Sequence, residues 1–483
     1  QRLMREALGS PHVESRATRG PDRATLLRLA RPKLSARVRD IDSAEAILVV
    51  GTDPLHSSPI LDLRIRKAMR RCGARLAVAT ERPTALDGGA EAAVRYAPGG
   101  ATLFLSELAA CLRLGSQGGA ASPLAEVLRG AENVTIVWGE RIGREGEGAL
   151  RALLDVAAAL GLAAKDHSGL LEIPEAANAR GLREVGCLPD AGPGLVEVAA
   201  GKGTEGIRAA LEAGELKTVV LFGVDPLRDF PDTGAWERAL EAADRVIAFS
   251  LFENATTVRA DVVLPLETHA EKDGTVTHPD GRLQRVRPSA ARPGEVRAGR
   301  RVLADLCAAL GDDTGVSSQT SALEALAEAV PFYAGIDDAE IGGRGVRWQD
   351  REAAAALPDA EEAAGTPSPG GQPGGAEPAE GVLALGTYRD LWAGPITELN
   401  PPLRFLEPEQ RVELSPADAE RLGLACGDEV TVSRNGTSLR AKVVLRERIA
   451  DGACFLIEGV AEGNANALLN GGPAAVRIEK AAG

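Results

Sequence analysis

Two short apolar runs in the chain end in nearly the same four residues. Residues 46–50 read Ala-Ile-Leu-Val-Val and residues 218–222 read Thr-Val-Val-Leu-Phe, and a Gly-x-Asp-Pro turn follows each run. Neither run alternates polar with apolar side chains, which is typical of a parallel strand covered on both faces. Because ligands bind outside the carboxyl ends of such strands, the repeat predicts two related half-sites facing one crevice. The turn residues are Gly51, Asp53, Pro54, Gly223, Asp225 and Pro226.

The residues after the first run predict alternating helices and strands. Apolar positions at helical spacing occupy residues 60–71, and residues 74–79 read as a second strand. A further strand at 133–138 leads through a glycine-rich turn into a helix whose apolar positions begin at Leu150. This order is that of βαβ units and favours a parallel sheet.

The residues after the second run repeat this plan. They predict a helix at 236–243, strands at 245–250 and 260–265, and then a polar loop at 267–284. Loops carry function more often than cores do, so this loop is a candidate site.

Two histidines in the polar loop raise the question of a metal. His269 and His278 stand near Glu271 and Asp273, but neither HExxH nor a similar ligand spacing is present. We therefore expect no metal site here. A serine hydrolase is disfavoured too, because no GxSxG sequence occurs.

The last hundred residues differ in character from the rest. They follow a linker rich in Pro, Gly, Ala and Glu at 351–381. Residues 411–424 predict a strand and a capped short helix, and residues 427–445 predict a hairpin around Asn435-Gly436. A small β-barrel fits this pattern.

The length of 483 residues predicts several domains. We expect an Arg-rich lead-in at 1–45, a first α/β domain at 46–195, a second α/β domain at 196–350, the linker at 351–381 and a β-barrel at 382–483.

Composition narrows the function classes. The net charge of -14 and an aromatic content of 3% argue against nucleic-acid binding, although residues 1–40 hold ten Lys or Arg against four Asp or Glu. That segment is either a surface for an acidic partner or a solvated stretch. No apolar run approaches the roughly 18 residues that span a bilayer. The start, Gln-Arg-Leu-Met, has no leader pattern and favours a cytoplasmic protein or a piece of a longer one.

Nucleotide and cluster motifs are missing from the sequence. The glycines at 143, 146 and 148 are in the wrong order for GxGxxG, and Glu140, Glu145 and Glu147 would repel a pyrophosphate. We read this turn as one that admits close helix–strand packing. The six cysteines, of which the closest pair is 28 residues apart, fit no iron–sulfur or zinc motif.

Taken together, these segments resemble the molybdopterin oxidoreductase superfamily. The resemblance is strongest to its non-catalytic branch, the large iron–sulfur subunit of bacterial NADH-quinone oxidoreductase, which is respiratory complex I. The likeness is carried by the two Gly-x-Asp-Pro turns, Val137-Trp-Gly139, residues 178–181, 188–194 and 260–284, and the barrel segment 414–430.

The resemblance implies a fold and a crevice. The fold would be α/β, with two Rossmann-like doubly wound domains in a pseudo-twofold relation and a C-terminal β-barrel. Each turn would face one half of a bis-pterin cofactor. The vestigial crevice would be lined by the six turn residues together with Glu271, Gly274 and His278.

Departures from the family pattern decide the expected chemistry. Where catalytic relatives carry a molybdenum ligand, residues 13–21 hold no cysteine and only Ser15 as a donor of that kind. The stretch after the second strand reads Thr80-Glu-Arg-Pro83, and His278 replaces the usual Asn. We therefore expect no catalytic residues, no metal ligands and no molybdopterin in this chain. The iron–sulfur clusters belong to a part of the family that precedes this region.

The sequence leaves three candidate functions, each from a different class of protein. The first is a non-redox structural body of the iron–sulfur subunit, bound to other peripheral-arm subunits on the cytoplasmic face of the inner membrane. The second is an active molybdenum bis-pterin enzyme similar to formate dehydrogenase or nitrate reductase. The third is a module that binds a nucleotide or an anion, which an acidic crevice containing Asp53 and Asp225 disfavours.

Overall fold

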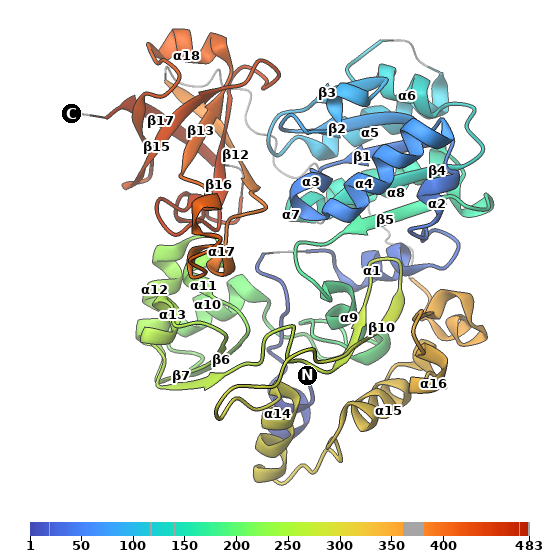
Figure 1. Ribbon diagram of the computed structural model, residues 1–483, viewed down its shortest axis with the longest axis vertical. Coiled ribbons are helices and arrows are strands. Elements are labelled where there is room, and N and C mark those ends of the chain that lie inside the picture. Colours follow the sequence, from blue (N-terminus) through green and yellow to red (C-terminus); the bar gives the residue numbers. More distant parts are fainter. Residues whose placement is uncertain (19, 116–117, 140, 361–380, 473, 482–483) are drawn as a thin grey trace. The chain divides into compact units, whose positions relative to one another are not determined.

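The computed structural model describes residues 1–483 except 19, 116–117, 140, 361–380, 473 and 482–483 (Figure 1). The chain divides into two compact units that do not follow sequence order. Unit 1 holds Gln1–Pro32, Ala176–Leu227 and Gly234–Ala363, and unit 2 holds Lys33–Glu175, Arg228–Thr233 and Ala364–Gly483. The five-segment division expected from the sequence stays a prediction, and most of the expected linker lies outside the described residues.

Unit 2 contains a five-stranded parallel sheet in the order β3-β2-β1-β4-β5. This order is that of a doubly wound fold, in which β1 is central and the strand order reverses beside it. The strands predicted at 46–50, 74–79 and 133–138 are confirmed. The five strands are β1 (Ala46–Val50), β2 (Arg75–Thr80), β3 (Ala92–Arg95), β4 (Val134–Gly139) and β5 (Gly169–Ile173).

Helices cover both faces of this sheet. On one face Ile47 and Val49 share a buried cluster with Leu61 and Ile65 of α4 (Pro59–Lys67). On the other face lie α5 (Ala101–Leu114), α6 (Ser122–Leu128) and α8 (Glu147–Ala159). Every residue of β1 is buried, as its unbroken apolar sequence predicts.

Unit 2 also contains the predicted barrel, which closes in the order β12-β16-β13-β15-β14-β17. The predicted hairpin is confirmed as β14 and β15, and Asn435 and Gly436 both have positive φ, as a type I′ turn requires. The strands are β12 (Val382–Arg389), β13 (Arg411–Leu414), β14 (Glu429–Arg434), β15 (Thr437–Leu445), β16 (Ala453–Glu458) and β17 (Ala474–Lys480).

The parallel sheet of unit 1 has three strands, β6 (Thr218–Phe222), β7 (Arg245–Ser250) and β8 (Val262–Pro265). The expectation that residues 218–222 are covered on both faces is wrong. Phe222 is 41% exposed, because β6 is an edge strand and burial alternates along it. The apolar run therefore marks a strand without marking two-sided burial.

The predicted polar loop at 267–284 is also corrected, because it contains most of a small antiparallel sheet. This sheet has the order β11-β10-β9, with strands β9 (Gly274–Thr277), β10 (Arg282–Val286) and β11 (Val346–Arg347). Only Leu283 and Thr277 of the two strands β9 and β10 are buried, so their sequence lacks the apolar alternation that identifies strands.

Short helices complete both units, and two of them, α1 and α2, lie in the expected lead-in. Among the described residues no helix combines the length and apolar character needed to cross a bilayer. Besides short 3-10 and π helices, the remaining α-helices are α1 (Arg23–Ala30), α2 (Asp40–Ser43), α3 (Pro54–Ser57), α7 (Arg141–Arg144), α9 (Ala179–Glu184), α10 (Thr204–Glu212), α11 (Pro226–Asp229), α12 (Thr233–Ala242), α13 (Ala255–Val258), α14 (Gly299–Ala309), α15 (Gln319–Ala329), α16 (Asp338–Ile341), α17 (Pro395–Glu398) and α18 (Pro416–Leu422).

Candidate functional site

The first Gly-x-Asp-Pro turn lies at the carboxyl end of the central strand β1. Gly51 has φ 63°, which favours glycine, and its N–H donates to Ala79 O at 3.0 Å. Asp53 then caps α3, because its Oδ1 accepts the Leu55 N–H at 3.2 Å. Pro54 occupies the first helical turn, where its missing N–H costs nothing. The turn is thus a strand end and a helix start in one.

The space beside this turn is filled by the chain itself. A Cβ on Gly139, at the end of β4, would come 2.3 Å from Gly51 O, so the two strand ends approach backbone to backbone. A Cβ on Gly51 would come 2.5 Å from Cγ1 of Ile142, whose side chain is buried. The ends of β1 and β4 form the switch point where doubly wound sheets bind ligands. Here Ile142 occupies that position.

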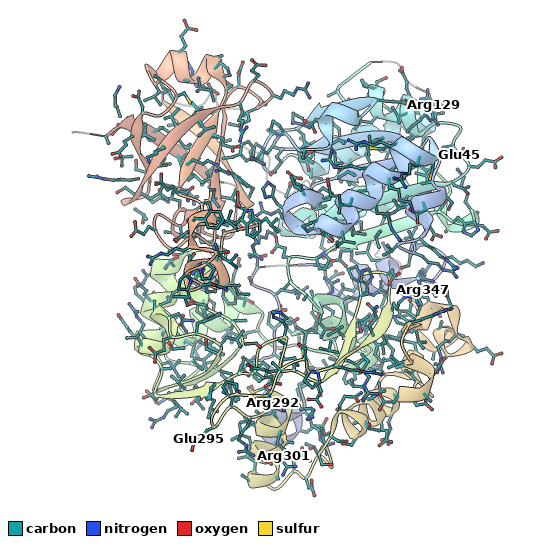
Figure 2. All side chains as sticks on the ribbon, in the orientation of Figure 1. Glu45, Arg129, Arg292, Glu295, Arg301 and Arg347 are labelled. Atoms are coloured by element: carbon teal, nitrogen blue, oxygen red, sulfur yellow. The ribbon has the colours of Figure 1, made fainter. Side chains whose placement is uncertain are left out.

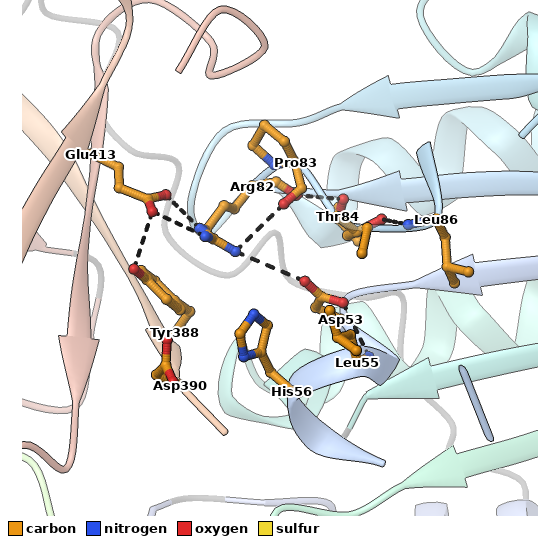
Figure 3. Close-up of polar contacts among 12 residues, drawn as sticks. Asp53, Leu55, His56, Arg82, Pro83, Thr84, Leu86, Tyr388, Asp390 and Glu413 are labelled. Carbon is orange, nitrogen blue, oxygen red and sulfur yellow. Dashed lines mark hydrogen bonds and ion pairs between the residues drawn. The ribbon is translucent and has the colours of Figure 1, made fainter. Parts of the chain in front are cut away.

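An ionic cluster joins the end of β2 to the barrel (Figure 3). Arg82 donates from Nε and Nη2 to the two carboxylate oxygens of Glu413, at 2.6 and 3.0 Å. The Arg82 guanidinium carbon lies 3.8 Å from the centre of the Tyr388 ring, and Nη1 lies 3.8 Å from Asp53 Oδ2. A bidentate ion pair of this kind, stacked on an aromatic face, fixes the guanidinium plane.

Three further contacts saturate the Glu413 carboxylate, which has no solvent exposure. Arg446 Nη2 and the Tyr388 hydroxyl each donate to Oε1 at 3.1 Å, and Arg411 Nε lies 3.6 Å from the same oxygen. Burial opposes ionisation, but the hydrogen bonds and charge of Arg82 hold the pKa of Glu413 below its ordinary value. Burial and the nearby Glu413 charge raise the pKa of Tyr388 to about 12. We call Arg82, Tyr388, Arg411, Glu413 and Arg446 the Glu413 cluster.

A second buried carboxylate of the barrel, Glu458 on β16, receives arginines from the β4 side of the sheet. Arg141 Nη2 lies 2.7 Å from Oε2, and Arg144 Nη1 donates to Oε1 at 3.1 Å. The Thr387 hydroxyl also donates to Oε1. Although burial acts in the opposite direction, the two arginine charges hold the pKa of Glu458 well below its usual range. Glu458, Thr387, Arg141 and Arg144 form the Glu458 cluster.

A third carboxylate occupies the N-terminus of α5. Glu145 Oε2 accepts the Ala101 N–H at 2.8 Å, and the carboxyl group also interacts with the Thr102 N–H, at a helix end whose dipole favours an anion. Its neighbour Glu81 accepts the Gly99 N–H at 3.0 Å, and the two carboxyl groups hydrogen-bond to each other. Burial and the Glu81 charge raise the pKa of Glu145 to about 8. Two carboxyl groups that hydrogen-bond to each other share a proton, because two buried negative charges side by side repel.

The second Gly-x-Asp-Pro turn, in unit 1, has plainer surroundings. Gly223 has φ 66° and donates its N–H to Phe249 O at 2.9 Å. A Cβ there would meet Leu266 Cδ1 at an ordinary 3.5 Å. Asp225 accepts a hydrogen bond from the hydroxyl of Thr256, which is buried, and Pro226 begins α11.

The other predicted crevice residues lie in the β9–β10 region of unit 1. Glu271 accepts the Thr268 N–H at 3.0 Å, Gly274 begins β9, and His278 Nδ1 lies 2.9 Å from Asp280 Oδ1. Each of these contacts is local. Among the described residues no group of three or more His, Cys, Asp or Glu side chains is arranged to hold a metal ion.

Sequence reasoning missed the residues with the richest chemistry, which are Arg82, Glu413, Tyr388 and Glu458. One signal was present in the sequence. Glu413 stands in the strand Arg411-Val-Glu-Leu414, on the face opposite to Val412, and both of these residues are fully buried. A charged residue in a short strand of this kind requires a partner. The sequence does not say which partner.

The fold and these sites define a member of the molybdopterin oxidoreductase class, and the predicted fold class is confirmed. The family described as molybdopterin oxidoreductase matches residues 27–309, and the molybdopterin dinucleotide-binding domain matches residues 383–478. The chain belongs to this family.

Individual relatives span several functions. The alpha subunit of NADPH-Fe(3+) oxidoreductase from Geobacter sulfurreducens is 29% identical over 540 residues, covering 100% of this chain and 62% of the relative. The G subunit of NADH-quinone oxidoreductase from Mycobacterium bovis is 30% identical, covering 91% of this chain and 52% of the relative. The chain therefore spans only about half to three fifths of these relatives.

A solved structure shows the same fold. Acetylene hydratase from Pelobacter acetylenicus superposes with a TM-score of 0.70 and 15% identity, covering 95% of this chain and 81% of that one.

Proposed function

We propose that this chain is the structural, non-redox body of the large subunit of a nicotinamide-dependent oxidoreductase, most similar in role to the G subunit of NADH-quinone oxidoreductase. It supports electron transfer through neighbouring iron–sulfur subunits or domains without carrying electrons. Both relatives described above are named as subunits of NADH- or NADPH-dependent oxidoreductases, which supports the coarser role. In this proposal the chain binds other peripheral-arm subunits on the cytoplasmic face of the inner membrane.

The observation that carries the proposal is the filling of the sheet edge by the chain's own groups. The family implies a molybdopterin dinucleotide, an anionic group that needs free hydrogen-bond donors and space at the strand ends. Here Ile142 fills the switch point, Glu145 takes the N–H groups of α5, and Arg82 binds Glu413. The residues on this edge therefore do not fit the cofactor.

In this proposal the buried ion pairs of the barrel fix its position against the five-stranded sheet. Each of the two barrel carboxylates, Glu413 and Glu458, is bound by arginines that follow strands of the five-stranded sheet. Buried charge pairs have strict geometric requirements, and losing one partner leaves the other charge buried and uncompensated. The two clusters thus hold the barrel and the sheet of unit 2 in one geometry without a cofactor between them.

The donor set also supports the absence of iron–sulfur ligation by this chain. The six cysteines are all free, three of them buried, and no cluster of ligating side chains occurs in the described parts. Iron–sulfur clusters need several thiolates at one place.

Elemental analysis tests the proposal directly. The chain is produced in a molybdenum-replete host, and molybdenum, iron and acid-released pterin fluorescence are measured per mole of protein. A molybdenum enzyme from the same host serves as the positive control. We expect far less than one molybdenum, pterin or iron per chain. Stoichiometric molybdenum with pterin would overturn the proposal.

The alternative is an active molybdenum bis-pterin oxidoreductase, similar to formate dehydrogenase or nitrate reductase. One observation favours it, namely that the dinucleotide-binding family matches most of the barrel. The same pterin measurement decides between the two, because the alternative requires a bound pterin that the structural role excludes.

A further inference from the structure

Unit 1 carries a concentrated group of arginines that the proposed function does not use. Residues 282–301 hold seven arginines and one glutamate, in a chain whose net charge is -14. The arginines are Arg282, Arg285, Arg287, Arg292, Arg297, Arg300 and Arg301. They run from β10 to the first turn of α14, and Figure 2 labels Arg292 and Arg301 at that helix.

This segment is held in place by specific hydrogen bonds. Ser289 and Ala290 donate their N–H groups to Ala270 O at 2.7 and 3.0 Å. The start of α14 is fixed as well, because Gly299 N donates to the buried Glu267 carboxylate at 2.6 Å. An ordered backbone presents its side chains at fixed positions, so less entropy is lost when a partner binds them.

Charge compensation within the segment is incomplete. Asp273 is shared by Arg292 and Arg300, at 3.0 and 2.8 Å. Asp305 is likewise shared by Arg297 and Arg301. Two guanidinium groups on one carboxylate leave a surplus positive charge at each place. The side chains of Arg297 and Arg301 remain 57% and 49% exposed, so this surplus reaches the surface.

Arg287 adds to the surplus. It is exposed, and its charge acts on the Asp338 carboxylate from beyond ion-pair distance, so Asp338 compensates Arg285 and Arg287 together. Nη1 of its neighbour Arg285 lies 3.7 Å from Asp338 Oδ1, which is beyond hydrogen-bond distance. Arg287, Arg297 and Arg301 are therefore three exposed arginines of one segment in an otherwise acidic chain, and we call them the Arg287 surface.

We propose that the Arg287 surface docks an acidic face of a neighbouring protein subunit. This inference rests on the proposed function, which supplies such a neighbour. Guanidinium groups bind carboxylates in a planar, two-pronged geometry and are common at the centres of protein interfaces. A nucleic acid or an anionic membrane is a poorer match, because Glu295 interrupts the surface and the chain as a whole repels an extended polyanion.

Binding of fluorescently labelled poly-L-glutamate, measured by anisotropy at low and physiological salt, tests the surface. The variant is Arg287→Gln/Arg297→Gln/Arg301→Gln, which removes three charges without creating a repulsive one. The control variant, Arg70→Gln/Arg71→Gln/Arg113→Gln, removes three exposed arginines of unit 2. We expect salt-sensitive binding by the wild type, weakened about tenfold or more in the first variant and within about twofold in the control.

A photo-crosslinking experiment identifies the protein that carries the acidic groups. A photo-crosslinker at exposed Ala290 in the assembled complex is expected to label an acidic segment of another subunit, whereas one at exposed Ala213 is not. Equal poly-L-glutamate binding by both triple variants would overturn the proposal. So would binding to vesicles containing phosphatidylglycerol that is lost only in the Arg287 variant, with no subunit crosslink. Circular dichroism verifies that each variant is folded, and the metal content of the protein does not enter this readout.

Discussion

The two Gly-x-Asp-Pro turns have nearly the same sequence and very different surroundings. The turn at Gly51 ends the central strand of a five-stranded sheet, whereas the turn at Gly223 ends an edge strand of a three-stranded one. A Cβ would collide with Ile142 at Gly51 and would make only an ordinary contact with Leu266 at Gly223. The motif specifies a local strand-to-helix connection. What lies beside that connection depends on the strands and loops that the rest of the chain supplies.

The two aspartates show the same difference. Asp53 lies at the edge of the Glu413 cluster, 3.8 Å from Arg82, and burial raises its pKa above the ordinary value. Asp225 has the hydroxyl of Thr256 as its partner. The first turn is thus part of a charged network within unit 2, and the second is a corner within unit 1 held by an uncharged hydrogen-bond donor.

Among the tests of this difference between the two turns, removing the charge of Glu413 is expected to lower the free energy of unfolding most. Glu413→Gln leaves Arg82 buried against a neutral side chain, and breaking a buried ion pair in this way costs about 3–5 kcal/mol. Urea unfolding followed by circular dichroism measures the loss. Hydrogen exchange is expected to rise first in peptides that cover residues 80–84 and the barrel strands.

The matched control for that experiment is Glu409→Gln. Glu409 pairs with Lys442, but its side chain is 76% exposed and solvent screens the pair, so the expected loss of stability is small compared with that of Glu413→Gln. Equal effects of the two substitutions would show that the Glu413 cluster contributes no more than a surface ion pair.

Glu145→Gln is the next test, and it is expected to change how the free energy of unfolding depends on pH. In the folded chain the pKa of Glu145 is raised to about 8 by burial and by Glu81, so the folded state holds a proton that the unfolded state releases. The free energy of unfolding therefore falls as pH rises from about 5 to about 8. Glutamine keeps the neutral form, so the variant is expected to lose most of this slope.

Unfolding at pH 5.5 and pH 8.5 measures the slope in the wild type, in Glu145→Gln and in Glu126→Gln, a control at an exposed helix position. A slope in Glu145→Gln as steep as that of the wild type would show that another group binds the proton.

Thr256→Val tests the second turn and is expected to have a smaller effect. Valine keeps the shape and removes the hydroxyl that donates to Asp225, a loss of about 1.5–3 kcal/mol for a hydrogen bond to a charged group.

Asp53→Asn is the companion substitution at the first turn. Asparagine caps a helix as well as aspartate does, so the expected change is below about 0.5 kcal/mol. A larger loss in Asp53→Asn would place Asp53 at the centre of the charged network.

Local patterns in the sequence predict the parallel strands that precede and follow the two turns and the barrel hairpin, because apolar runs and an Asn-Gly turn act over a few residues. The antiparallel sheet β11-β10-β9 has no such pattern and was not predicted. The charged contacts are not predictable in this way. Glu413 meets Arg82 across 331 residues of sequence, so no window contains both partners. Even the apolar pattern has a limit, because β6 has the composition of a buried strand and yet lies at an edge.

The candidate crevice shows the same limit. Gly51 belongs to unit 2 and His278 to unit 1, and each has local partners, so the shared crevice stays a prediction. The sequence carries the ancestral motif. The contacts by which Ile142, Glu145 and Glu413 fill the sheet edge are not recognisable from the sequence alone.

The order of residues in unit 2 has a consequence for the synthesis of the protein. The ribosome releases residues 33–175 early, but the barrel carboxylates arrive only after the whole of unit 1 has been made. Until then Arg82, Arg141 and Arg144 have none of their barrel partners. Unit 1 can therefore complete its folding before the barrel has been made, whereas unit 2 can complete its own folding only after the barrel strands have been synthesised.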